Sequence, residues 1–185
     1  MITRVVGTTK VTLIVGDITL QGTDAIVNAA NSSLMGGGGV DGAIHRVGGP
    51  AILEECKRII ETIGSLEPGL AVGTTAGNMR SRYVIHTVGP MWIDGNHDEG
   101  SVLYSAYRSC LNVAMGYGLK TVSFPAISTG VYRYPLQDAA DMALAAVYGF
   151  LQNEDCFDEI VFVLFTDQIY EVYEAALLGL TEPLG

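Results

Sequence analysis

The sequence predicts an α/β protein in which one sheet is covered by helices on both faces. Segments patterned as strands alternate along the chain with segments of helical periodicity, which is typical of a sheet between two helix layers. One expected strand, residues 160–165, is apolar without interruption, which indicates that both of its faces are buried. The composition agrees, since 16% of the 185 residues are charged, 49% are hydrophobic and 23 are glycine. We expect a single domain, 1–185, with a core of its own.

Strands and helices can be placed in order from apolar runs and turn residues. Short apolar runs between turn residues predict strands at 4–6, 11–15, 25–27, 71–76, 83–88, 121–125 and 160–165. Apolar residues at three- and four-residue spacing predict helices at 42–47, 50–63, 101–116, 137–152 and 168–178. Residues 94–100 are polar and predict a loop, and the tail after Leu178 predicts no element.

The strongest functional signal lies in residues 24–49. The strand 25–27 continues into Asn28-Ala29-Ala30-Asn31, and four glycines, Gly36–Gly39, precede Val40 and Asp41. Glycine takes positive φ freely and has no Cβ, so the N–H groups of such a run can converge on an anion. The N-terminus of the following helix adds donors and a positive dipole end. We therefore predict a phosphate-binding loop with Asn31 and Asp41 at its rim.

Two other interpretations of this loop are weaker. A plain connector would not require four glycines, because ordering them costs more chain entropy than ordering other residues. Gly37, Gly39 and Gly42 match G-x-G-x-x-G, the pattern of dinucleotide-binding folds. In those folds the first glycine directly follows its strand, whereas nine residues separate Val27 from Gly37 here.

Charge and cysteine content exclude several classes of protein. The net charge is −10, whereas non-specific nucleic-acid binding needs Lys and Arg to neutralise phosphates, so we expect no such binding. If the protein binds an anionic ligand, we expect backbone N–H groups to hold it. Three widely spaced cysteines without a C-x-x-C pattern predict reduced thiols and no metal site. The chain shows no membrane-length apolar span and no signal-peptide core near its start. We therefore expect a cytoplasmic protein without membrane contact.

Ligands of such sheets bind beyond the strand ends, where three loops and one aromatic residue qualify. The loops are residues 16–19, 28–41 and 128–132, and the aromatic is Phe165 at the end of the last strand. Asp17 lies in a turn at the end of a strand. A carboxylate there usually caps local backbone N–H groups, and the alternative is that it contacts the edge of a nucleotide base. We interpret His45 and His86 as structural, and His86 as a hydrogen-bonded core residue.

Together these motifs resemble the macro domain family, and within it the MacroD-type branch. The resemblance covers nearly the whole chain and rests on Gly16–Thr19, Asn28–Asn31, Gly36–Arg46, Val84–Pro90 and Ser128–Tyr132. It implies a three-layer α/β/α sandwich with a mixed central sheet and an ADP-ribose site. It also implies removal of mono-ADP-ribose from modified acidic side chains of proteins, and deacetylation of O-acetyl-ADP-ribose. We expect no cofactor.

The resemblance further implies roles for individual residues. Asp17 and the Ile18 N–H would bind the adenine, and Phe165 would stack on it. Tyr132 would pack on the distal ribose, where Asn31 and Asp41 would act. The diphosphate would be held by the backbone N–H groups of Gly37, Gly38, Gly39, Val40, Ser128, Thr129, Gly130 and Val131.

Asp41 is the expected catalytic group. A water-exposed aspartate is ionised at neutral pH, because its ordinary pKa is about 3.9, and it can orient or deprotonate a water molecule. How water activation is divided between Asp41 and the substrate's own phosphate stays open. Two other functions also stay open: a non-catalytic ADP-ribose reader and an ADP-ribose 1″-phosphate phosphatase. The joint presence of Asn31 and Asp41 favours the hydrolase.

The chain departs from the MacroD-type pattern at Arg133, where relatives commonly have glycine after the tyrosine. If the backbone there needs a positive φ, arginine is strained, and either something offsets that cost or the loop has shifted. We predict that the side chain lies at the rim of the distal pocket and not inside it.

Overall fold

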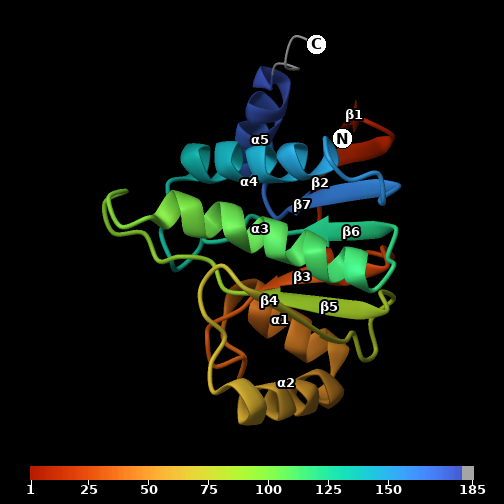
Figure 1. The fold of residues 1–185 in the computed structure, drawn as a ribbon, viewed down its shortest axis with the longest axis vertical. Coiled ribbons are helices and arrows are strands. Elements are labelled where there is room, and N and C mark those ends of the chain that lie inside the picture. Colours follow the sequence, from red (N-terminus) through yellow and green to blue (C-terminus); the bar gives the residue numbers. More distant parts are fainter. Residues whose placement is uncertain (181–185) are drawn as a thin grey trace.

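A mixed sheet of seven strands forms the centre of the computed structural model, which describes residues 1–180 (Figure 1). The strand order is β1-β2-β7-β6-β3-β5-β4. The strands are β1 (Ile2–Val6), β2 (Thr9–Val15), β3 (Ala25–Ala29), β4 (Ala71–Thr75), β5 (Tyr83–Thr87), β6 (Thr121–Phe124) and β7 (Glu159–Leu164). Residues 181–185, part of the tail for which we predicted no element, lie outside the described residues.

Five central strands run parallel and two edge strands run antiparallel to them. β2, β7, β6, β3 and β5 form the parallel set, with Val15 opposite Leu164 at the end of the β2–β7 pair. β1 pairs antiparallel with β2, and β4 pairs antiparallel with β5. Parallel neighbours need crossover connections, which the helices supply. The predicted mixed sheet is confirmed.

The helices lie on the two faces of this sheet and bury a core against each. The helices are α1 (Gly39–Gly48), α2 (Pro50–Ile63), α3 (Glu99–Gly116), α4 (Leu136–Leu151) and α5 (Asp167–Gly179). One core contains side chains of α3, α4 and α5, and the other contains Ile44 of α1 and Ile52 of α2. Neighbouring residues of β3 alternate between them, since Val27 belongs to the first core and Ile26 to the second. The three-layer α/β/α architecture is therefore confirmed.

Most predicted elements match, and the main differences lie at the ends of helices. α2 spans the predicted residues 50–63, whereas α1 begins at Gly39 and includes the end of the glycine run. A 3-10 turn, η1 (Ile18–Leu20), was not predicted, and Asp17 is its N-cap. The predicted loop 94–100 ends earlier, because α3 begins at Glu99.

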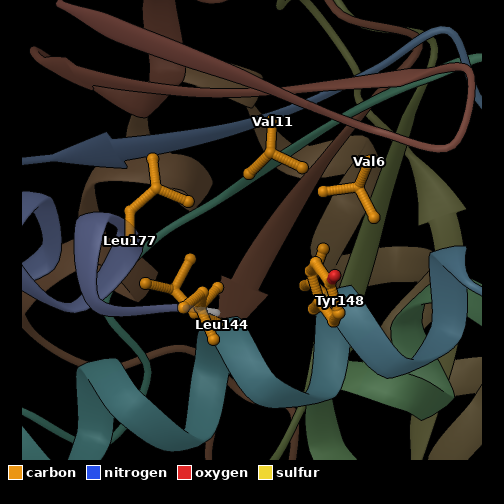
Figure 2. Close-up of a pocket in the computed structure, with 7 residues that line it drawn as sticks. Val6, Val11, Leu144, Tyr148 and Leu177 are labelled. Carbon is orange, nitrogen blue, oxygen red and sulfur yellow. The ribbon is translucent and has the colours of Figure 1, made fainter. Parts of the chain in front are cut away.

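A small gap remains in the first core, away from the strand ends that carry the candidate site. It has a volume of about 10 Å³ and lies between β1, β2, α4 and α5. Val6 and Val11 face Leu144, Tyr148 and Leu177 across it (Figure 2). A cavity of this size holds at most one water molecule, and only where polar partners are available. We interpret it as a packing defect in the core. No helix within residues 1–180 meets the length and hydropathy needed to cross a membrane.

Candidate functional site

The predicted site residues gather at one edge of the sheet. Because the five central strands are parallel, their carboxyl ends lie at the same edge. Asp17 follows β2, Asn31 follows β3, Gly89 follows β5, Ser128 follows β6 and Phe165 follows β7. This is the edge at which α/β sheets bind ligands.

A cleft of about 340 Å³ opens between the glycine loop and the loop after β6. Both loops were predicted to bind one ligand, and they do border one space. The predicted residues that line it are Asn31, Gly37, Gly38, Gly39, Val40, Asp41, Ser128, Gly130, Val131 and Tyr132. The lining contains no Lys or Arg among the described residues, and Asp41 is its charged member.

Backbone N–H groups are the available donors for an anion in this cleft. Gly36 and Gly39 have φ of +86° and +57°, a region that favours glycine. α1 begins at Gly39, so its first N–H groups have no partner within the helix. Within residues 1–180, the N–H groups of 128–132 also make no hydrogen bond. Gly38, by contrast, has φ of −95°, so its backbone does not require glycine.

Asp41 is buried, which corrects the expectation of a water-exposed carboxylate. Only 5% of its surface is accessible. Its Oδ1 accepts a hydrogen bond from Asn28 Nδ2 at 2.8 Å, and His45 Nε2 lies 3.3 Å from the same oxygen. Its Oδ2 points toward Gly37, where an added Cβ would lie 3.2 Å away. One oxygen is thus fixed by the protein, while the other is directed at the glycine loop.

A second layer of polar residues lies behind Asp41. Asn28 is fully buried and its Nδ2 lies 3.1 Å from His86 Nδ1. His86 Nε2 lies 2.8 Å from Thr74 Oγ1. Burial, and then the charge of His45, lower the pKa of His86 to about 3, so His86 is neutral at physiological pH. Its predicted role as a hydrogen-bonded core residue is confirmed.

The amide of Asn31 braces the glycine loop. Its Nδ2 donates to the carbonyl of Gly36 at 2.9 Å, and its Oδ1 accepts from Ser33 Oγ at 2.7 Å. An added Cβ on Gly37 would lie 3.6 Å from the same Nδ2. Asn31 and Asp41 therefore flank Gly37 at one end of the cleft.

The remaining predicted residues lie outside the cleft lining. Asp17 and Phe165 follow the paired strands β2 and β7, and Phe165 is 79% exposed. Asp17 Oδ1 caps η1 by accepting from Thr19 N at 2.8 Å and Thr19 Oγ1 at 2.7 Å, so the capping role is confirmed. Ile18 is buried, and the Thr129 side chain turns back to donate to the Ala126 carbonyl.

Comparison with known proteins decides the family. The model of the Macro domain family matches residues 27–143, which include both cleft loops. The chain belongs to the Macro domain family. It is 51% identical over 164 residues to a protein named O-acetyl-ADP-ribose deacetylase 1 of Pantoea vagans, covering 89% of this chain and 96% of that protein.

Solved macrodomains have the same fold. The Oceanobacillus iheyensis macrodomain with ADP superposes with a TM-score of 0.92 at 40% identity, over 96% of this chain and 94% of that one. The Trypanosoma brucei macrodomain in complex with ADP-ribose superposes with a TM-score of 0.82 at 40% identity, over 90% of this chain and 68% of that one.

Arg133 adopts a left-handed backbone conformation, which settles the alternative that the sequence left open. Its φ is +59°, and its N–H donates to the Gly130 carbonyl at 3.0 Å. The side chain is exposed and does not line the cleft, in agreement with a rim position. Ser128 also has positive φ, +67°, and its buried Oγ has no hydrogen-bond partner within residues 1–180.

Sequence reasoning missed several residues of the macro domain cleft. Ala29, Ala30, Gly89, Ala126 and Ile127 line it beside the predicted residues. A usable sequence signal existed for Gly89, since it follows a predicted strand at the edge where ligands bind. The structure adds that a Cβ on Gly89 would lie 2.1 Å from Ser128 Oγ. His45, interpreted only as structural, also contacts the carboxylate of Asp41.

One cluster outside the cleft brings possible metal ligands together. Ligand atoms of Asp94, His97 and Glu99 lie within 4.8 Å of one another. Both carboxylate oxygens of Glu99 already accept backbone hydrogen bonds. Oε1 accepts from the N–H groups of Ile93, Asp94 and Gly95, and Oε2 accepts from the N–H group of His97. The cluster orders the loop before α3 and does not contribute to the cleft.

Proposed function

We propose that this protein binds ADP-ribose and hydrolyses its esters. Its substrates are O-acetyl-ADP-ribose and mono-ADP-ribose attached to acidic side chains of proteins. The observation that carries the proposal is the position of Asp41, a buried carboxylate with one oxygen fixed and the other directed at the glycine loop that lines the cleft. Relatives named O-acetyl-ADP-ribose deacetylase and macrodomains solved with ADP or ADP-ribose support the ligand class.

The cleft suits a diphosphate held without cationic side chains. Free N–H groups from the glycine loop and from residues 128–132 border it on two sides. Oriented N–H groups and a helix N-terminus bind phosphate oxygens well. Exposed Phe165 and the free side of the Asp17 carboxylate offer a stacking surface and an acceptor for adenine at the adjacent strand ends.

The proposed chemistry is addition of water across the ester bond, which yields ADP-ribose and a carboxylic acid. Asp41 Oδ2 orients the water and accepts its proton, while Asn28 and His45 hold Oδ1. Neutral His86 holds Asn28 from behind, so the carboxylate enters the reaction already oriented. Asn31 fixes the loop beside the distal ribose.

Incubation of the purified protein with two substrates tests the proposal. One is O-acetyl-ADP-ribose, and the other is a protein mono-ADP-ribosylated on Glu or Asp, with release of ADP-ribose followed by chromatography. We expect turnover of both. Tight binding of ADP-ribose without turnover of either ester would instead identify a reader. Selective turnover of ADP-ribose 1″-phosphate would identify a phosphatase.

A further inference from the structure

The hydroxyl of Tyr107 bridges two backbone groups where the chain leaves the sheet for the cleft. It donates to the Pro125 carbonyl at 3.2 Å and accepts from the Ile127 N–H at 3.2 Å. We propose that Tyr107, on α3, is a positioning residue that sets the geometry of the loop 126–132 and thereby the affinity of the cleft for its diphosphate ligand. The ligand in this inference rests on the proposed function.

Within the described part of the chain, the two bridged groups have no other partner. β6 ends at Phe124, so the carbonyl of Pro125 and the N–H of Ile127 lie beyond the last pairing of the sheet. Both residues are buried, and Ile127 is 1% exposed. Within residues 1–180, Tyr107 supplies the hydrogen bonds to both groups. A buried backbone group without a partner is costly, so loss of the hydroxyl should make this segment shift to find one.

The aromatic core fixes the position of this hydroxyl. The Tyr107 ring is fully buried, 5.2 Å from the ring of Phe124 and 6.1 Å from that of Phe162 between centroids. Burial also raises the pKa of the phenol well above its usual value, so it keeps its proton and can both donate and accept. α3 and the sheet therefore hold the hydroxyl rigidly against the loop.

The bridge reaches the lining of the cleft directly. Ile127 itself lines it, and Ser128 follows with φ of +67°. The loop is closed further on by Tyr134 N, which donates to the Ser128 carbonyl at 2.9 Å. A shift at Ile127 therefore changes the direction of the N–H groups that follow it.

Tyr107→Phe tests the inference, with Tyr173→Phe as the matched control. Tyr173 on α5 is equally buried, and its hydroxyl lies beside that of Tyr107, but within residues 1–180 it makes no hydrogen bond to the backbone of the loop. Tyr173→Phe therefore removes a neighbouring buried hydroxyl while the bridge from Tyr107 to Pro125 and Ile127 stays in place. Amide hydrogen exchange of the free protein and calorimetry with ADP-ribose are measured for both variants. We expect faster exchange at Ile127 and about tenfold weaker binding in Tyr107→Phe alone. The kcat at saturating substrate should stay within about threefold of wild type, because Asp41 lies on the other loop.

The outcomes separate this inference from the proposed function. Unchanged exchange at Ile127, or equal loss of affinity in both variants, would overturn the positioning role. Faster exchange with unchanged affinity would overturn its link to the ligand. Failure of the wild-type protein to bind ADP-ribose would contradict the proposed function, whereas the exchange comparison would still decide whether Tyr107 positions the loop.

Discussion

Arg133 holds a backbone conformation that L-amino acids rarely adopt. With φ of +59°, a residue that carries a Cβ is strained by roughly 1–2 kcal/mol relative to glycine. The strain persists because Arg133 N and Tyr134 N are both hydrogen-bonded within the loop. The guanidinium is exposed at the rim, where its charge is screened by solvent and salt.

We predict that Arg133→Gly raises stability slightly, whereas Arg133→Ala does not. Only glycine relieves the strain, and its greater freedom in the unfolded chain cancels part of the gain, leaving about 0–1 kcal/mol. Both variants lose the charge, so both should change ADP-ribose affinity only a few-fold, and less at high salt. Melting curves and titrations at two ionic strengths provide the check. A large, salt-insensitive loss in both would make Arg133 a direct phosphate ligand.

The sequence predicted Asp41 as a site residue but not its environment. Its partner Asn28 lies 13 positions away, and His86 lies 58 positions from Asn28. These contacts depend on how β3, β5 and α1 pack, which hydrophobic periodicity does not encode. The glycine run, by contrast, carried its own local signal, and its place beside the cleft was predictable.

The start of α1 is packed so closely that a side chain on one glycine there would clash with the backbone. A Cβ on Gly42 would lie 2.5 Å from the carbonyl oxygen of Gly37, whereas a Cβ on Gly38 would meet nothing within 4 Å. The first turn of α1 thus supports the glycine loop directly. The sequence could not distinguish these two glycines, since the difference is a contact made only in the folded loop.

We expect Gly42→Ala and Gly38→Val to have different effects. Gly42→Ala should destabilise the protein by roughly 1–3 kcal/mol through the clash, despite the better helix propensity of alanine. It should weaken ADP-ribose binding as well, because Gly37 must move. Gly38→Val should melt like wild type and lose affinity, since its side chain enters the cleft. Thermal melts and calorimetry decide this, and native affinity in Gly38→Val would show that the loop does not contact the ligand.

The loop before α3 is organised by a buried acid that the sequence analysis assigned to a polar loop. Glu99 is 2% exposed and accepts hydrogen bonds from four backbone N–H groups. Burial raises the pKa of its carboxyl, but the backbone donors outweigh this and bring the pKa down to about 2. Four donors converging on one glutamate leave no periodic pattern, which is why the sequence gives no sign of it.

Glu99 should make stability depend on pH in a defined window. Because its folded pKa is below the usual value of 4.5, its contribution is fully present above that value and is lost as pH falls toward about 2. Glu99→Gln should therefore lower the melting temperature by a constant amount near neutral pH, and the gap should close on acidification. Thermal melts of wild type and Glu99→Gln from neutral to acidic pH measure this difference in melting temperature. A gap that does not change with pH would contradict this account of Glu99.

The topology of the whole molecule explains why distant motifs form one site. Five parallel strands end at one edge, and each contributes a loop there, from Asp17 after β2 to Phe165 after β7. The alternation of strands and helices predicted the layers, and the loop motifs predicted most of the cleft. The molecule carries a net charge of −10 and the cleft lining contains no Lys or Arg within residues 1–180, so the proposed diphosphate ligand would depend on backbone donors at this edge.

The measurement that tests this account most directly compares turnover and binding in Asp41→Asn. The substitution is isosteric and keeps an acceptor for Asn28, but removes the carboxylate that would take the proton from water. We predict that kcat for O-acetyl-ADP-ribose falls by about 10²–10⁴-fold while the Kd for ADP-ribose stays within about tenfold of wild type. Turnover close to wild type in a correctly folded variant would remove Asp41 from the reaction and contradict the central claim.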